Sequence, residues 1–156
     1  MKLLFVCMGN ICRSPAAEGV MQTLIEKAEL QDTIFCDSAG TIGYHEGNPA
    51  DRRMSSAAKK RGYHLTSTAR KIIPDDLEKF DLILTMDEEN YDNVCALADS
   101  PEKEKKIKAL CDYCTSHDDT EVPDPYYGGN QGFEHVLDLL EDGCSNLLAS
   151  IKKQEG

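Results

Sequence analysis

Residues 3–15 read LLFVCMGNICRSP, and this stretch decides the fold. Its first four residues form a continuous apolar run, which is typical of a parallel strand buried on both faces. Ser14 before Pro15 indicates the start of a helix, with serine as the N-cap and proline at the first helical position. Cys7 is therefore predicted to lie at the end of a buried strand, before a tight turn into a helix.

Strands and helices alternate along the rest of the chain. Further strands are predicted at residues 34–37, 81–86 and 106–110. Helical spacing and helix stop signals predict helices at residues 17–28, 51–61, after the third strand to about 98, and 133–151. Residues 116–132 are rich in Asp, Pro and Gly and predict a loop. The alternation predicts a single α/β domain over residues 1–156, with a doubly wound parallel sheet between two helical layers.

Composition limits the classes of function. The chain has 156 residues and a formal net charge of −11. Such an acidic chain argues against partners that are nucleic acids or anionic membrane surfaces. The opening apolar run is too short for a signal peptide or a membrane span. Seven cysteines without a regular framework then indicate reduced thiols, so we expect a cytoplasmic protein.

The turn after Cys7 has the composition of an anion site. Gly9 and Asn10 tolerate the left-handed backbone angles that a tight turn needs. Inward N–H groups of residues 8–13 would then form a cradle, and Arg13 would add a planar fork that matches two phosphate oxygens. A helix start and a nearby guanidinium favour the thiolate of Cys7, which is the nucleophilic form. The alternative is a buried structural thiol.

Four segments carry a family resemblance. They are CMGNICRSP at 7–15, DSAG at 37–40, TMD at 85–87 and VPDPYYGG at 122–129. In content, order and separation they resemble the low-molecular-weight protein-tyrosine phosphatase family, over essentially the whole chain. The resemblance implies a four-stranded parallel sheet with the phosphate-binding loop after the first strand.

The resemblance also implies a two-step reaction on phosphotyrosine. Cys7 would form a cysteinyl-phosphate, Arg13 would clamp the phosphoryl group, and Asp124 would act as general acid and then as general base. The loop would consist of Met8, Gly9, Asn10, Ile11 and Cys12, with hydrogen bonds from Asn10, Ser14 and Ser38 to hold it. Neither a metal nor a cofactor is expected.

The chemistry of an aryl phosphate agrees with the role of Asp124. Its leaving oxygen needs a proton donor. Pro123 and Pro125 stiffen the backbone on both sides of Asp124 and fix the direction of its carboxyl group. We expect burial and adjacent negative charge to keep this carboxyl protonated in the substrate complex. The alternative is an ordinary turn residue in an acidic loop.

Aromatic and apolar residues are predicted at the rim of the site. Tyr126 and Tyr127 could stack on a flat aromatic substrate, and the resemblance makes both candidate phosphorylation sites. Tyr44 matches an aromatic wall residue of the family. Ile11 would form an apolar floor; arginine phosphatases of this family tend to carry threonine there, so Ile11 favours phosphotyrosine.

The other cysteines suggest redox regulation. Cys12 lies five residues after Cys7, and a reversible disulfide between them would protect Cys7 from irreversible oxidation. A small packed residue is the alternative reading of Cys12. Cys111 and Cys114 form a lone CxxC without a second pair or a His cluster, so structural thiols are favoured over a metal or redox site.

Two other classes share parts of this pattern. In a thiol-coupled arsenate reductase, the loop cysteine attacks arsenate and further cysteines relay electrons, which Cys111 and Cys114 could do. The intact DPYY segment at 124–127 counts against it. A non-catalytic phosphate-binding module would lack Cys7, Arg13 or Asp124. We therefore expect a tyrosine-phosphorylated protein as substrate, phosphate, sulfate or vanadate as active-site anions, and a monomer or weak dimer.

Overall fold

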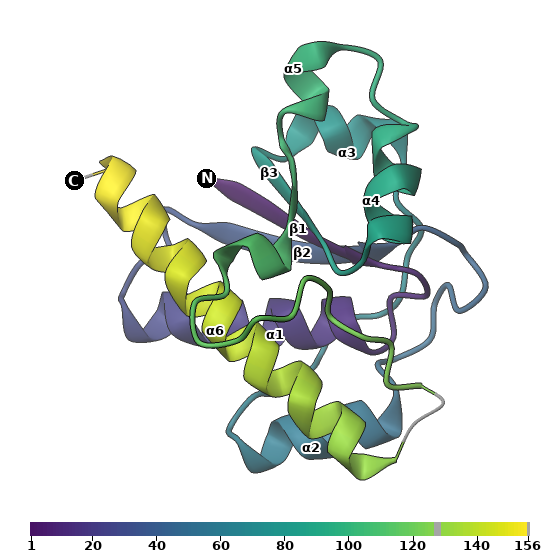
Figure 1. The fold of residues 1–156 in the computed structure, drawn as a ribbon, viewed down its shortest axis with the longest axis vertical. Coiled ribbons are helices and arrows are strands. Elements are labelled where there is room, and N and C mark those ends of the chain that lie inside the picture. Colours follow the sequence, from purple (N-terminus) through teal and green to yellow (C-terminus); the bar gives the residue numbers. More distant parts are fainter. Residues whose placement is uncertain (127–128, 156) are drawn as a thin grey trace.

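A parallel sheet of four strands forms the centre of the molecule in this computed structural model, which describes residues 1–126 and 129–155 (Figure 1). The strands are β1 (Lys2–Cys7), β2 (Phe35–Gly40), β3 (Leu82–Thr85) and β4 (Ile107–Ala109). Their order is β2-β1-β3-β4, and every neighbouring pair is parallel. The predicted α/β fold with a four-stranded, doubly wound sheet is confirmed. β1 is central, so its carboxyl end lies where ligands bind in such sheets.

Helices cover both faces of the sheet. One layer contains α1 (Arg13–Lys27), α2 (Arg52–Lys60) and the long α6 (Asn130–Glu155), which lies across α1. The other layer contains α3 (Pro74–Lys79), α4 (Glu88–Cys95) and α5 (Pro101–Glu104). A 3₁₀ turn, η1 (Leu110–Tyr113), links β4 to the segment before α6. The short elements α3, α5 and η1 were not predicted from the sequence.

The alternating side chains of β1 divide the core into two clusters. Leu3 and Phe5 pack with apolar residues of α1, α2 and α6, whereas Leu4 and Val6 pack with residues of α3 and α4. All four are fully buried. Successive side chains of a strand point to opposite faces, so a continuous apolar run indicates that both faces are covered.

The predicted cap of the first helix is wrong. α1 begins at Arg13, and Cys12 holds the N-cap position without a side-chain cap bond. Ser14 lies inside the first turn, where its hydroxyl bonds to Cys7 and Asn10 of the loop after β1 rather than capping the helix. In two later helices, residues of a type typical of N-caps do hold that position: Asp51 caps α2 and Asp87 caps α4. Most predicted boundaries differ from the structure by one to three residues; the last helix begins at Asn130 and extends to Glu155.

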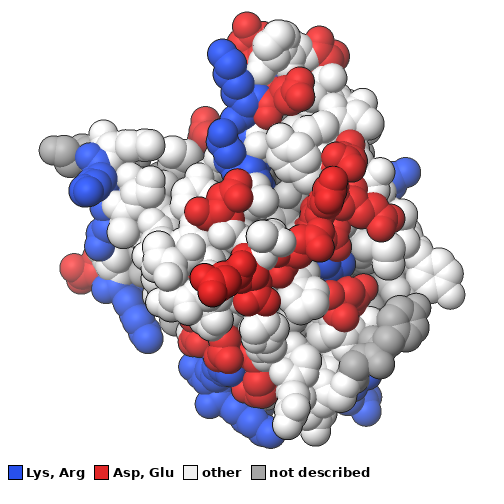
Figure 2. All heavy atoms as spheres, in the orientation of Figure 1, with Lys and Arg blue, Asp and Glu red and all other residues white. Residues whose placement is uncertain are grey.

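The face on which α6 lies carries many acidic side chains, as Figure 2 shows. This agrees with the net charge of −11. An anion must therefore be bound by a local positive site against an unfavourable overall field. Within the described residues, none of the helices combines the length and the hydropathy needed to cross a membrane.

Candidate active site

The loop after β1 is fixed by its own carbonyl groups. The carbonyls of Cys7 and Met8 accept hydrogen bonds from the N–H groups of Thr41 and Ile42, at 2.9 and 3.0 Å. The carbonyl of Ile11 accepts one from Asp51 at 2.7 Å. Because these carbonyls are bound by other segments, the loop can turn its N–H groups inward, as it does at Asn10, which is the geometry of an anion cradle. We call residues 7–14 the phosphate loop.

Asn10 holds the centre of the phosphate loop. Its φ of 59° is left-handed, as the sequence predicted for this turn. Its N–H group points at the Cys7 sulfur at 3.3 Å, and its side-chain amide donates to Ser14 Oγ at 2.7 Å. Its Oδ1 accepts from the backbone N–H of Arg70 at 3.0 Å. A remote segment thus fixes the left-handed residue of the loop.

Cys7 is buried and has polar neighbours. Its sulfur lies 3.1 Å from Ser14 Oγ and 3.3 Å from the N–H of Asn10. Because Ser14 Oγ accepts from the Asn10 amide, its one hydrogen can point to the Cys7 sulfur at 3.1 Å or to the carbonyl of Ala39 at 3.4 Å. Two polar groups therefore face the sulfur that is predicted to be the nucleophile.

Arg13 is the buried cation of the site, with a side chain only 3 % exposed. Its Nη1 bonds to Asp87 Oδ2 at 2.7 Å and to the carbonyl of Val122 at 3.1 Å. Burial opposes the charged form, but Cys7 and Asp87 outweigh it and raise the pKa of Arg13. The guanidinium is therefore permanently charged, and Asp87 fixes its direction. The sequence singled out the segment of Asp87 only through the family resemblance.

The structure brings Asp124 to the same place from far along the chain. Its Oδ2 lies 3.8 Å from Arg13 Nη2, and its Oδ1 accepts from the N–H of Tyr126 at 3.0 Å. The backbone before it is anchored by the N–H of Val122, which donates to the carbonyl of Met86 at 2.7 Å. The carboxyl side chain is 34 % exposed, so it can exchange protons with water.

These groups line one cavity of about 310 Å³. Its walls are Cys7, Met8, Gly9, Ile11, Cys12, Arg13, Ile42, Tyr44, His45, Asp124 and Tyr126. The acidic, basic and nucleophilic groups lie together with apolar and aromatic ones, as in a site for an aromatic phosphate. The predicted Tyr127 lies outside the described residues.

The rim includes two residues that sequence reasoning missed. His45 packs edge-on against Tyr44, with ring centroids 4.8 Å apart, and lies 6.5 Å from the ring of Tyr126. Tyr44 itself is 83 % exposed, so its ring is free to meet a substrate. Ile42 is the second missed residue. Both follow the DSAG turn within five positions, which is the signal that could have found them.

Within the described part of the chain, the hydroxyl of Ser38 makes its hydrogen bond outside the phosphate loop. This hydroxyl donates to Glu18 Oε1 at 2.6 Å, in contrast to the predicted role in holding the loop. Gly40 of the same turn supports the loop instead, by close approach. A Cβ atom at Gly40 would lie 2.8 Å from the carbonyl oxygen of Met8. The DSAG segment therefore supports the site by lacking a side chain at its last position.

Cys12 lines the cavity with Cys7 but differs from it chemically. Burial, together with the negative charges of Asp51 and Cys7, raises the pKa of Cys12 to about 12. Cys12 is thus a protonated thiol at neutral pH. The two cysteines of one loop have different environments, because only the sulfur of Cys7 receives the hydrogen bonds of the loop.

Cys111 and Cys114 lie elsewhere and are packed as structural thiols. Neither is among the described residues that line the cavity at Cys7. Burial and its neighbour Cys114 raise the pKa of Cys111 to about 12, and Cys114 donates to the carbonyl of Leu139 at 3.5 Å. This placement gives no support to an electron relay to Cys7.

Comparisons with known proteins agree on one family. The sequence model for low molecular weight phosphotyrosine protein phosphatase matches residues 2–156. A putative low molecular weight protein-tyrosine-phosphatase of Synechocystis sp. is 56% identical over 99% of this chain and 98% of its own length. The human low molecular weight phosphotyrosine protein phosphatase is 40% identical over 94% of this chain and 92% of its own.

Solved structures give the same answer. A protein tyrosine phosphatase from Entamoeba histolytica, with Hepes in its active site, superposes with a TM-score of 0.96 at 47% identity, over 100% of this chain and 99% of that chain. An arginine phosphatase from Drosophila superposes with a TM-score of 0.91 at 33% identity, over 97% of this chain and 98% of that one. This chain belongs to the low molecular weight phosphotyrosine protein phosphatase family.

Proposed function

We propose that this protein hydrolyses phosphotyrosine in proteins, with Cys7 as nucleophile, Arg13 as phosphoryl clamp and Asp124 as general acid and base. The observation that carries the proposal is the meeting of these three side chains at one cavity that also has aromatic walls. Each group alone has a structural explanation. Together they match the roles that phosphoryl transfer to a thiol requires.

In the first step, Cys7 Sγ attacks phosphorus while the bond to the tyrosine oxygen breaks. The loop N–H groups and Arg13 receive the phosphoryl oxygens, and the Ser14 hydroxyl stabilises the thiolate before attack. These donors are in place before substrate arrives, and such preorganised charge stabilisation is a large contribution to rate. Asp124 gives its proton to the leaving phenolate, and tyrosine departs.

In the second step, water attacks the phosphorus of the cysteinyl-phosphate. Asp124, now a carboxylate, accepts a proton from that water, and Cys7 leaves as thiolate with inorganic phosphate as product. The same cradle fits phosphate, sulfate or vanadate as inhibitory anions, because all are tetrahedral or related oxyanions. No step in this scheme requires a metal ion.

The choice of phosphotyrosine rests on the walls of the cavity. Ile11 supplies an apolar surface in the loop itself, and Tyr44 and Tyr126 lie at its rim. A phenyl ring buries apolar area and stacks on such walls. A phosphorylated guanidinium is polar throughout and gains less from them. Activity on phosphoarginine is the second possibility, in view of the Drosophila neighbour.

Redox control of Cys7 by Cys12 is part of the proposal. A peroxide would oxidise Cys7 to a sulfenic acid, and the Cys12 sulfur would then displace water to form the disulfide. The raised pKa of Cys12 slows this second reaction, since the thiolate is the attacking form.

The domain organisation, location and oligomeric state expected from the sequence stay proposals. We propose one phosphatase domain over residues 1–156, since the family match spans nearly all of them. The seven free cysteines suit a reducing compartment, which supports a cytoplasmic location. A monomer, or a weak dimer, stays a prediction.

A steady-state assay tests the substrate class. Peptides with phosphotyrosine, phosphoserine or phosphoarginine are compared, with vanadate as inhibitor. We expect kcat/KM for phosphotyrosine to exceed the other two by about 100-fold or more, because only its ring contacts the apolar walls and because a phenolate leaves more readily than the alkoxide of serine. A preference for phosphoarginine would replace the proposed substrate while leaving the cysteine mechanism in place.

A further inference from the structure

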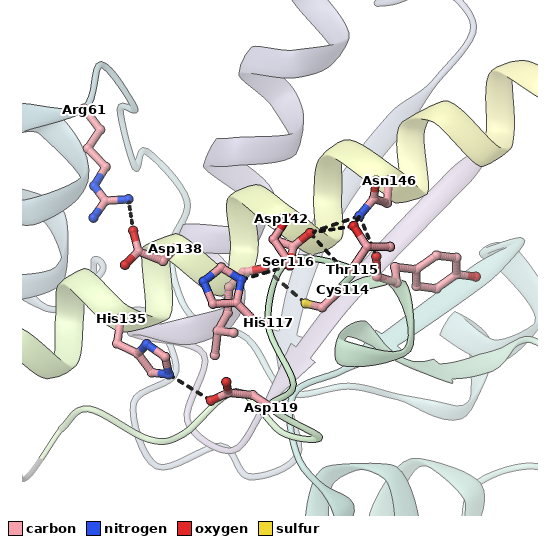
Figure 3. Close-up of polar contacts among 12 residues, drawn as sticks. Arg61, Cys114, Thr115, Ser116, His117, Asp119, His135, Asp138, Asp142 and Asn146 are labelled. Atoms are coloured by element: carbon pink, nitrogen blue, oxygen red, sulfur yellow. Dashed lines mark hydrogen bonds and ion pairs between the residues drawn. The ribbon is translucent and has the colours of Figure 1, made fainter.

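The segment between η1 and Asp124 has no regular secondary structure, yet several of its groups are held by α6. Figure 3 shows where they meet. Asp142 of α6 accepts hydrogen bonds from the N–H groups of Thr115 and Ser116, at 3.1 and 2.9 Å. Nδ1 of His117 lies 2.9 Å from the same carboxylate. We call residues 113–126 the acid segment.

Asn146, one turn further along α6, completes this attachment. Nδ2 of its side-chain amide, which carries two hydrogens, lies within hydrogen-bond distance of three acceptors: the carbonyl of Tyr113 at 2.8 Å, Thr115 Oγ1 at 3.1 Å and Asp142 Oδ1 at 3.0 Å. We call Asp142 and Asn146, with the backbone groups and His117 that they hold, the α6 clasp. Its centre is a carboxylate whose side chain is only 6 % exposed. A carboxylate so little exposed is stable only when donors surround it.

A second tie lies between the clasp and the catalytic end of the segment. Asp119 bonds to Nε2 of His135 of α6 at 2.8 Å. Beyond it, Glu121 accepts from the N–H of Glu88 at 2.6 Å, at the start of α4. The acid segment is therefore attached to α6 at its beginning and to the β3–α4 region near Asp124. These side-chain contacts take the place of regular backbone pairing.

We infer that Asp142 and His117 are positioning residues for the general acid, because the α6 clasp fixes the conformation of the segment that carries Asp124. This inference rests on the proposed role of Asp124. Proton donation needs the donor within hydrogen-bond reach of the leaving oxygen. A loop with many accessible conformations spends less time in that arrangement, and each tie removes conformations before substrate arrives.

The clasp also responds to pH. Its bond to Asp142 raises the pKa of His117, so the ring stays charged to higher pH than an ordinary histidine. The ion pair is present below that raised pKa and is lost as pH increases through it. Other charged or titratable groups around His117 are Asp119, Asp138, Glu141 and His135, and Arg61 pairs with Asp138 and Glu141. The acidic groups outnumber the basic ones, which also favours the imidazolium.

The test compares two leaving groups. Phenyl phosphate has a poor leaving group and needs the acid, whereas 4-nitrophenyl phosphate has a good one and needs it less. We expect Asp142→Asn to lower kcat/KM for phenyl phosphate about tenfold and for 4-nitrophenyl phosphate less than about twofold. Asn146→Ala, which keeps the carboxylate, should give a smaller effect of the same kind. Thermal melts confirm that each variant is folded.

Glu134→Gln is the matched control. Glu134 lies about two helical turns before Asp142 on α6, and its carboxylate accepts from Arg61 rather than from the acid segment. We expect it to leave the ratio of the two substrates unchanged. His117→Asn keeps a donor near the Nδ1 position and removes the titration, so the substrate ratio should vary less with pH than in the unaltered enzyme.

The double variant with Asp124→Ala separates the possible outcomes. If the clasp acts through Asp124, Asp142→Asn has no further effect in that background. If Asp142→Asn lowers kcat/KM equally on both substrates, or lowers it further in the Asp124→Ala background, the clasp supports only the fold. If Asp142→Asn leaves kcat/KM unchanged on both substrates, the inference is overturned but the proposed function is not. A normal rate for Asp124→Ala on phenyl phosphate overturns the proposed acid, and the inference with it.

Discussion

The phosphate loop and the acid segment, the two halves of the site, are held in different ways. In the phosphate loop, the contacts of Cys7, Asn10 and Ser14 join residues three to seven positions apart. In the acid segment, Val122 bonds to Arg13, which is 109 positions away, and Asp142 bonds to residues more than 20 positions away. The nucleophile and the cradle thus combine these local contacts with hydrogen bonds from the segments of Thr41, Asp51 and Arg70, whereas the acid segment is placed mainly by tertiary contacts.

The difference predicts where the enzyme tolerates change. The phosphate loop is held by internal hydrogen bonds as well as by hydrogen bonds from other segments. A segment held by scattered ties can shift without unfolding the protein, because each tie contributes little to the core. Substitutions of the main residues of the phosphate loop should abolish turnover, whereas substitutions around the acid segment should lower it by different amounts.

The largest effect is expected at the nucleophile. Cys7→Ser should lower turnover of aryl phosphates by about four orders of magnitude or more, since no second thiolate takes the place of the sulfur. The fold and melting temperature should persist. Cys95→Ser, in a residue outside the lining of the cavity, is the control. Turnover within tenfold of normal in the Cys7 variant would remove the covalent mechanism.

The second largest effect is expected at the general acid, Asp124. Asp124→Ala should slow turnover of a phenol with a poor leaving group by about two to three orders of magnitude, as for loss of general acid catalysis. A good leaving group should be affected less. Asp118→Ala, in an exposed residue of the same segment, should change neither rate. Equal sensitivity of both substrates to Asp124→Ala would mean that the acid is misassigned.

Arg13 connects the two halves of the site, because it belongs to the phosphate loop and bonds to Val122 of the acid segment. Asp87 accepts a hydrogen bond from the guanidinium of Arg13. Asp87→Asn should lower kcat/KM about tenfold, because the guanidinium keeps its charge and loses part of its alignment. Measured dissociation constants for phosphate should increase in parallel. Asp92→Asn, at an exposed position of α4, is the matched control. An unchanged kcat/KM would show that Val122 alone aligns Arg13.

The smallest effect is expected under the phosphate loop. Gly40→Ala places a methyl group 2.8 Å from the Met8 carbonyl, so the loop must shift. We expect a loss of stability of about 1–3 kcal/mol, which is typical of overpacking, and a decrease in kcat of a few-fold. Gly43→Ala meets Lys71 at an ordinary 3.7 Å and should be neutral in a melting experiment. A neutral Gly40→Ala would show that the loop has room to adjust.

The sequence predicted the sheet and the phosphate loop because their signals are local. The apolar run of β1 and the turn residues Gly9 and Asn10 are adjacent in the chain. The cap of the first helix was predicted wrongly from the sequence, because the hydroxyl of Ser14 bonds within the phosphate loop instead of capping the helix. The position of Asp124 came from resemblance alone, and Asp87, His45 and Gly40 had no separate signal strong enough to assign them a role.

The amino-acid sequence by itself determined the order of strands and helices and the shape of the turn after Cys7, since backbone preference and apolar spacing act between near neighbours. Only the tertiary structure decided which carboxylate reaches the cavity, which hydroxyl faces the sulfur, and how α6 holds the acid segment. Those outcomes depend on packing between distant elements, where burial and hydrogen-bond satisfaction select one arrangement among many that the local preferences allow.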